Sequence, residues 1–173
     1  MGQDCRKTIV AVLWEGTVPS VNRIKSRLDC NLEVYSHYYC QTHGITLAQI
    51  VERIRSAEVS LIYSMSKEFF EDLLAEIQPY LSECKIVCEG VSASPILNTV
   101  EPEIAVRANR YLKEKGDENM FRLFDYLEKT FVGKAGEPLP PVEMPKEALV
   151  NLTDGSIMDS LEDYLSECLP PHP

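Results

Sequence analysis

The sequence has 173 residues, of which 45% are hydrophobic and 25% are charged, and its formal net charge is −10. These proportions are typical of one globular domain, with or without a tail, and they argue against a disordered or fibrous chain. The excess of acidic side chains leaves no basic surface for a phosphate backbone and repels an anionic membrane, which argues against nucleic acid and membranes as partners.

The amino-terminal residues are polar, and no apolar run is long enough to cross a membrane, so we expect a cytoplasmic protein. No Cys-x-x-Cys pair occurs, and the zinc spacings are therefore missing. We expect buried, reduced thiols at the six cysteines, which are Cys5, Cys30, Cys40, Cys84, Cys88 and Cys168.

Strand and helix patterns alternate through the first hundred residues. The run 8–14 is β-branched and almost entirely apolar, as in a strand buried on both faces, and apolar residues at helical spacing follow over 18–28. Further strand patterns occur at 32–35, 59–63 and 85–88. The helical patterns between them have apolar faces over 47–54, with Thr46 as the N-cap residue, and over 69–77.

This alternation predicts right-handed βαβ crossovers. The fold class is therefore α/β, with a small parallel sheet of about four strands, helices on both faces, and a flavodoxin-like or Rossmann-like arrangement. The pattern leaves the strand order undetermined, and 2-1-3-4 is our hypothesis.

Two consecutive helical patterns follow the last strand, one from Glu101 to Gly116 and one from Asp117 to Phe131. The prolines of residues 136–145 then predict an extended connector or wrap, because proline fits neither a helix interior nor a central strand. We expect an α/β domain over 1–133 and a proline-rich linker or tail over 134–173, with one short helix carrying Ile157, Leu161, Tyr164 and Leu165.

The loops at the carboxyl ends of the strands are the candidate ligand sites, because ligands of open α/β sheets bind there. The hydroxyls and helix N-termini of these loops can donate hydrogen bonds to a carboxylate or phosphate. Small polar residues also serve tight turns, and that structural interpretation stays open. The candidate ligand-binding residues are Trp14, Glu15, Gly16, Ser64, Ser66, Glu89, Gly90 and Ser92.

Motifs for nucleotide binding and covalent catalysis are missing. Neither Gly-x-Gly-x-x-Gly nor the P-loop pattern occurs, and no Gly-x-Ser-x-Gly elbow activates Ser92 or Ser94. Glu15 and Glu89 both follow strands and suit an acid–base pair, but capping of helix dipoles explains them more simply. Trp14 either stacks on a planar ligand or packs in the core, which is the commoner fate of a large aromatic residue.

A second cluster of reactive side chains lies at 36–43, in the loop expected after the second strand. His37, Cys40 and His43 are suitable ligands for a late transition metal. A fourth ligand is missing, and aromatic packing on the sheet end accounts for the segment, so we predict no metal site and no catalytic residue here.

Several short motifs occur in a familiar order. They are Val-Glu-Pro-Glu at 100–103, a tyrosine-containing helix ending at Gly116, Asp-Glu-Asn-Met-Phe at 117–121, the proline-rich passage at 138–145, and Ser-Leu-Glu-Asp-Tyr-Leu at 160–165. Together they resemble the large-subunit family of cobaltochelatase and magnesium chelatase. The chain departs from the family at Asp117, where a second glycine is usual, and over 148–153, where an aromatic, histidine-bearing segment is usual.

In that family the large subunit binds a tetrapyrrole and a divalent metal, and partner ATPase subunits drive metal insertion, as in cobalamin biosynthesis. The resemblance implies an N-terminal module that contributes to corrin or porphyrin binding, or that docks with the remaining domains or subunits of the complex. Cobalt or magnesium and ATP are implied for the full complex alone. We expect no cofactor on this chain and no catalysis by it alone.

Two alternatives stay open. One is a flavodoxin-like protein-interaction domain without a small-molecule ligand. The other is a small Rossmann-like enzyme, which the missing glycine fingerprint and nucleophile motifs argue against.

Overall fold

Four parallel strands form the central sheet of the computed structural model, which describes residues 7–63, 67–90, 94–143, 149–150 and 157–158. The strands are β1 (Thr8–Leu13), β2 (Asn31–Tyr35), β3 (Val59–Tyr63) and β4 (Ile86–Glu89), in the order β2-β1-β3-β4. Every neighbouring pair is parallel. The predicted fold class and strand order are both confirmed.

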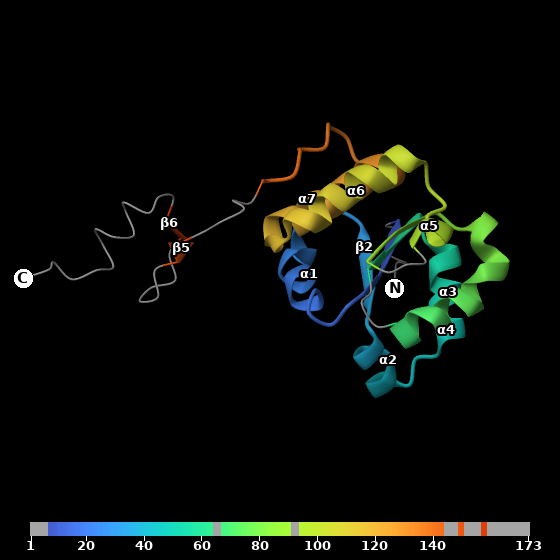
Figure 1. The fold of residues 1–173 in the computed structure, drawn as a ribbon. Coiled ribbons are helices and arrows are strands. Elements are labelled where there is room, and N and C mark those ends of the chain that lie inside the picture. Colours follow the sequence, from blue (N-terminus) through green and yellow to red (C-terminus); the bar gives the residue numbers. More distant parts are fainter. Residues whose placement is uncertain (1–6, 64–66, 91–93, 144–148, 151–156, 159–173) are drawn as a thin grey trace, which may run out of the picture. The chain divides into compact units, whose positions relative to one another are not determined.

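Helices cover both faces of this sheet (Figure 1). On one face lie α1 (Val18–Ile24), the short 3₁₀ turn η1 (Lys25–Arg27), α6 (Pro102–Glu114) and α7 (Gly116–Leu127). On the other lie α3 (Leu47–Ser56) and α4 (Lys67–Ile77), with the 3₁₀ turn η2 (Gln78–Glu83) after α4. The short helix α5 (Ser94–Leu97) follows β4.

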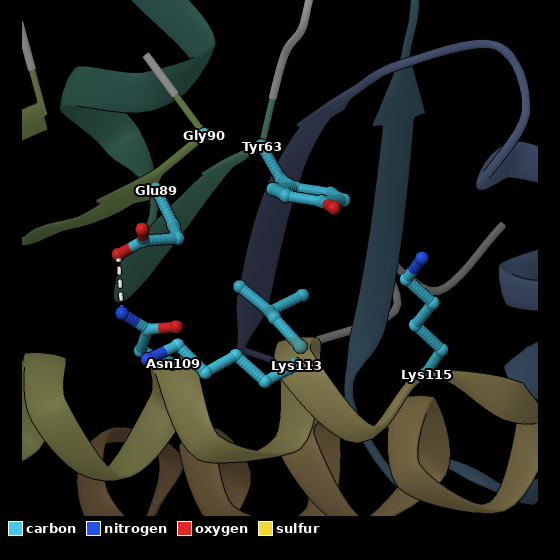
Figure 2. Close-up of a pocket in the computed structure, with 7 residues that line it drawn as sticks. Tyr63, Glu89, Gly90, Asn109, Lys113 and Lys115 are labelled. Atoms are coloured by element: carbon cyan, nitrogen blue, oxygen red, sulfur yellow. Dashed lines mark hydrogen bonds between the residues drawn. The ribbon is translucent and has the colours of Figure 1, made fainter. Parts of the chain in front are cut away.

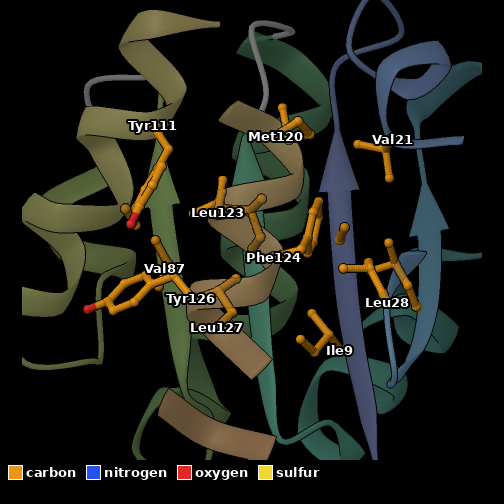
Figure 3. Packing of buried hydrophobic residues seen from close by; sticks show 14 of the residues in the cluster. Ile9, Val21, Leu28, Val87, Tyr111, Met120, Leu123, Phe124, Tyr126 and Leu127 are labelled. Carbon is orange, nitrogen blue, oxygen red and sulfur yellow. The ribbon is translucent and has the colours of Figure 1, made fainter. Parts of the chain in front are cut away.

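The two faces of β1 belong to two separate hydrophobic clusters, because side chains of a strand alternate between faces. Ile9 packs with α1, α6 and α7, whereas Val10 packs with α3 and α4. Figure 3 shows Phe124 and Leu127 of α7 lying over the sheet. Burial on both sides explains why the first strand is almost entirely apolar.

The segment after β2 is a helix, α2 (His37–His43), and our prediction of a loop there is wrong. The Ser36 hydroxyl accepts the N–H of Tyr39, and Gly44 ends the helix at φ 64, a left-handed conformation that glycine adopts without steric cost. A serine before the segment and a glycine after it were the signals that we overlooked.

The end of α7 widens into one turn of π-helix, η3 (Glu128–Val132). This turn fully buries the Glu128 carboxylate, which accepts the N–H groups of Asp29 and Cys30, both at 2.7 Å, and the Lys134 ammonium at 2.7 Å. Burial, followed by the nearby Glu128 charge, raises the pKa of the Cys30 thiol to about 12. Glu128 thereby ties the turn before β2 to α7.

Four of the six cysteines lie within the described residues. These four are buried thiols, as expected, at Cys30, Cys40, Cys84 and Cys88. Cys5 and Cys168 lie outside the described residues.

The chain divides into two units, residues 1–142 and residues 143–173. In the second unit β5 (Leu149–Val150) pairs antiparallel with β6 (Ile157–Met158). The predicted helix is therefore wrong at Ile157, and its other three positions lie outside the described residues. Among the described residues, no helix has both the length and the apolar composition needed to cross a membrane.

Candidate functional site

Two adjoining cavities lie at the carboxyl ends of the central strands. The first has a volume of about 350 Å³ and the second about 200 Å³, and both are lined by Tyr63, Leu112 and Lys115. The first also reaches Glu89, Gly90, Asn109 and Lys113 (Figure 2). The second also reaches Trp14, Gly16, Thr17, Ser20, Gly116 and Met120.

The topology brings these side chains together. Tyr63 ends β3 and Glu89 ends β4, while the backbone N–H of Trp14, just after β1, donates to the Tyr63 carbonyl at 2.7 Å. α6 faces the same edge with Asn109, Leu112 and Lys113. Because these three residues are spaced i, i+3 and i+4, they share one side of the helix.

The lining of the first cavity carries a net positive charge. Its described residues include two ammonium groups, Lys113 and Lys115, against the single carboxylate of Glu89. Glu89 accepts a hydrogen bond from the Asn109 amide at 2.8 Å, which is the dashed line in Figure 2. Within the described part of the chain, neither lysine forms an ion pair. In a chain of net charge −10, two unpaired cations at a cavity favour an anionic ligand.

The second cavity has an aromatic wall. Trp14 is 43% exposed, so the alternative in which it packs in the core is wrong. Its ring lies directly on Gly16, since a Cβ at that position would come within 2.5 Å of the indole. Met120 and Leu112 line the same cavity, which therefore offers an apolar surface beside the two lysines.

The backbone at the junction of α6 and α7 is strained. Lys115 has φ 56 and ψ −168, a conformation that costs a residue other than glycine about 1–3 kcal/mol. Asp117, in the first turn of α7, accepts two hydrogen bonds from Arg23, at 2.5 and 2.8 Å, and one from the Ser20 hydroxyl. The hydrogen bonds from Arg23, followed by that from Ser20, lower the pKa of the Asp117 carboxyl to about 2.

Asp117 connects two helices beside the second cavity. Its carboxylate links the first turn of α7 to α1. The neighbouring residues Lys115 and Gly116 line that cavity.

The candidate residues named from the sequence have different fates. Trp14, Gly16, Glu89 and Gly90 line the two cavities. Glu15 is not among the lining residues; its carboxylate instead accepts the backbone N–H of Tyr38 at 2.9 Å, at the start of α2. Ser64, Ser66 and Ser92 lie outside the described residues, as does Ser94 with respect to its side chain.

The geometry supports neither of two sites weighed from the sequence, an acid–base pair of Glu15 and Glu89 and a metal site at 36–43. Glu15 and Glu89 have different partners, Tyr38 of α2 and Asn109 of α6. His37 stacks on Phe69, with ring centroids 5.0 Å apart, and His43 stacks on Tyr39 at 4.1 Å. Within the described residues, no group of three or more His, Cys, Asp or Glu side chains is placed to hold a metal ion.

Sequence reasoning missed Asn109 and Lys113 of α6, and Lys115 directly after it. The pattern after β4 predicts two consecutive helices, and no candidate site residue is assigned to them. The signal in the sequence is that polar and basic residues share a helical face with the apolar Leu112, which indicates that this face meets both the sheet and a polar site.

Comparisons with known proteins give one solved structure of similar fold, the catalytic subunit of cobaltochelatase from Mycobacterium tuberculosis. The TM-score is 0.60 and the sequence identity 16%, over 84% of this chain and 12% of that chain. The likeness is one of fold. No family model and no curated protein matches the sequence. This chain therefore corresponds in fold to a small part of a much longer subunit.

Proposed function

We propose that this chain is a tetrapyrrole-binding module of a metallochelatase-like large subunit, and that the two cavities receive the carboxylate-bearing edge of a corrin or porphyrin. The fold likeness to a cobaltochelatase catalytic subunit and the order of the motifs at 100–165 both support this proposal. The observation that carries it is the pair of lysines at the cavities, Lys113 and Lys115.

The two cavities supply complementary halves of such a site. Lys113, Lys115 and the Asn109 amide can donate hydrogen bonds to side-chain carboxylates of the macrocycle, and charge-assisted bonds of this kind are the stronger ones. Trp14 and Met120 offer an aromatic and apolar surface to the ring itself. A mostly apolar wall with a few convergent polar groups is the usual character of a small-molecule site.

In this proposal the chain binds and does not catalyse by itself. The metal ion is a substrate of insertion, and the described residues offer it no cluster of ligands. Metal delivery and ATP hydrolysis would belong to the remaining domains or subunits of the complex, which are the partners that we propose for this chain.

The proposal is tested by titrating the protein with a carboxylated porphyrin or corrin and following the fluorescence of Trp14, the sole tryptophan. Because Trp14 lines the second cavity, we expect quenching at tens of micromolar ligand or below. The double variant Lys113→Met, Lys115→Met is expected to bind about tenfold more weakly. Lys25→Met is the matched control, because Lys25 is exposed and lines neither cavity.

A second arm uses the same macrocycle with its carboxylates amidated. If the lysines recognise carboxylates, the amide binds the wild type and the double variant equally weakly. Equal binding of acid and amide by the wild type would contradict the proposed contacts, and unquenched Trp14 with no absorbance change in the ligand would contradict tetrapyrrole binding altogether.

A further inference from the structure

The proline-rich segment after η3 lies along α6 and α7, and we call its residues 137–142 the strap (Figure 1). Most of its contacts within the described part of the chain share one character: side chains of the helices donate to carbonyl oxygens of the strap. The accepting carbonyls are those of Glu137, Pro138, Leu139, Pro140 and Val142.

The donors come from α6, α7 and η3. They are Arg107 to Pro138 at 2.9 Å, Tyr111 to Leu139 at 2.5 Å, Asn119 to Val142 at 2.8 Å, Arg122 to Pro140 at 2.7 Å and Lys129 to Glu137 at 3.0 Å. The consecutive elements α6, α7 and η3 therefore hold five of the six carbonyls of the strap.

Recognition of the strap depends on its main chain. The side chains of Leu139 and Val142 are 54% and 36% exposed, so they contribute little packing. Proline has no N–H group, and a segment bound through its carbonyls loses nothing by containing it. The Val142 N–H donates to the Asn119 side chain at 2.7 Å, and the buried Asn119 amide thus both donates to and accepts from one strap residue.

The donors are held in place by contacts within the helices. Arg107 lies over the Tyr126 ring, 4.8 Å from its centroid. Arg122 pairs with Glu118 at 2.9 Å, and Lys129 pairs with Asp125 at 2.7 Å. Side chains ordered before a ligand arrives reduce the entropic cost of binding it.

We propose that α6 and α7 form a peptide-binding groove for extended, proline-rich segments, and that the strap is its exchangeable occupant from the same chain. Gly136, at φ 99, directly precedes the strap and supplies a turn that other residues rarely adopt. The groove is a site separate from the cavities, and its recognition of carbonyl groups tolerates changes of strap side chain.

The test separates the strap from the groove without removing either. A protease recognition sequence is inserted between Ala135 and Gly136 of the full chain, and the purified protein is then cut. We expect the two fragments to stay associated at tens of micromolar, and a synthetic peptide of residues 136–143 to displace the cut strap in a fluorescence titration.

Two matched variants show how the peptide is recognised. Asn119→Ala removes the amide that pairs with Val142, and is expected to weaken binding about fivefold or more. Leu139→Ala changes an exposed strap side chain, and is expected to alter binding by less than about twofold. Separation of the fragments at every concentration while the larger fragment keeps its circular dichroism, or equal weakening by both variants, would overturn the proposal.

If cutting unfolds the protein, hydrogen exchange on the uncut chain tests the proposal instead. The Val142 amide is expected to be protected in the wild type and in Leu139→Ala, and to exchange at least fivefold faster in Asn119→Ala. An unprotected Val142 amide in the wild type would overturn the proposal. A stable dimer of the uncut chain that the free peptide dissociates would overturn the assignment of the strap to its own chain.

Discussion

The helices on the two faces of the sheet differ in where their charged groups lie and in whether their backbone is strained. On the face of α3 and α4 the charged groups stay at the surface, as where Arg55 pairs with Glu52 at 3.2 Å and with Glu83 at 2.8 Å. α3 begins with a complete capping box, in which the side chains of Thr46 and Gln49 each bond the other's backbone N–H. These ion pairs and this helix cap stabilise the fold, and no further role is needed to explain them.

The face of α1, α6 and α7 carries features that cost stability. Glu128 is a fully buried charge, Lys115 has a strained backbone, and Trp14 exposes its indole. Backbone strain tends to collect at functional sites, and here Lys115 lies beside the two cavities together with the exposed Trp14. The comparison teaches that the face of α1, α6 and α7 carries the candidate site and the strap together with the features that cost stability.

The largest expected effect is at Glu128. Glu128→Ala leaves the amides of Asp29 and Cys30 without their acceptor and removes a partner of Lys134, so we expect the free energy of unfolding to fall by about 3 kcal/mol. Urea denaturation measures the change. Glu52→Ala, which removes an exposed ion pair on α3, is the control and is expected to cost less than about 0.5 kcal/mol. Comparable losses in the two variants would break the contrast between the faces.

The next effect concerns Trp14. Gly16→Ala puts a methyl group where the indole ring now lies, so the ring must move, at a cost of about 1–2 kcal/mol. We expect a shift in Trp14 emission and altered quenching by iodide, measured on the folded protein. If the emission spectrum stays as in the wild type, the ring does not rest on Gly16 and the aromatic wall of the second cavity needs revision.

A smaller effect is expected on the opposite face. Thr46→Ala removes the cap of α3 and is expected to lower the free energy of unfolding by about 1 kcal/mol. Because α3 lines neither cavity, Trp14 emission and macrocycle binding should stay unchanged. Altered ligand binding in this variant would show that both faces support the site.

The sequence predicts the features that depend on local pattern. The four strands and the Thr46 cap follow from apolar runs and capping chemistry, whereas these patterns leave the order of the strands undetermined. The sequence also names Trp14 and Glu89 at the strand ends, and both line the cavities there.

The remaining features depend on packing between distant segments. Lys113 becomes a cavity residue only because α6 faces the ends of β3 and β4, and no periodicity within the helix specifies which strand ends it meets. The prolines predict a wrap, but the partners of the strap lie 8 to 31 residues earlier in the sequence. Side-chain donors such as Asn119 have no sequence pattern of their own.

The smallest expected effect, at Asp117, tests whether the Asp117 carboxylate stabilises the contact between α7 and α1. The folded pKa of about 2 lies below the ordinary value of about 3.9, so the contribution of Asp117 is present above about pH 4 and is lost as the pH falls toward 2. Asp117→Asn should remove this part of the pH dependence, seen as a shallower fall in the free energy of unfolding between pH 4 and 2. Asp72→Asn on the exposed surface of α4 is the matched control and should retain the wild-type slope. Parallel curves for the wild type and Asp117→Asn would mean that the Arg23 pair contributes nothing to the folded state, and that the strained Lys115 is held by the packing of α6 and α7 alone.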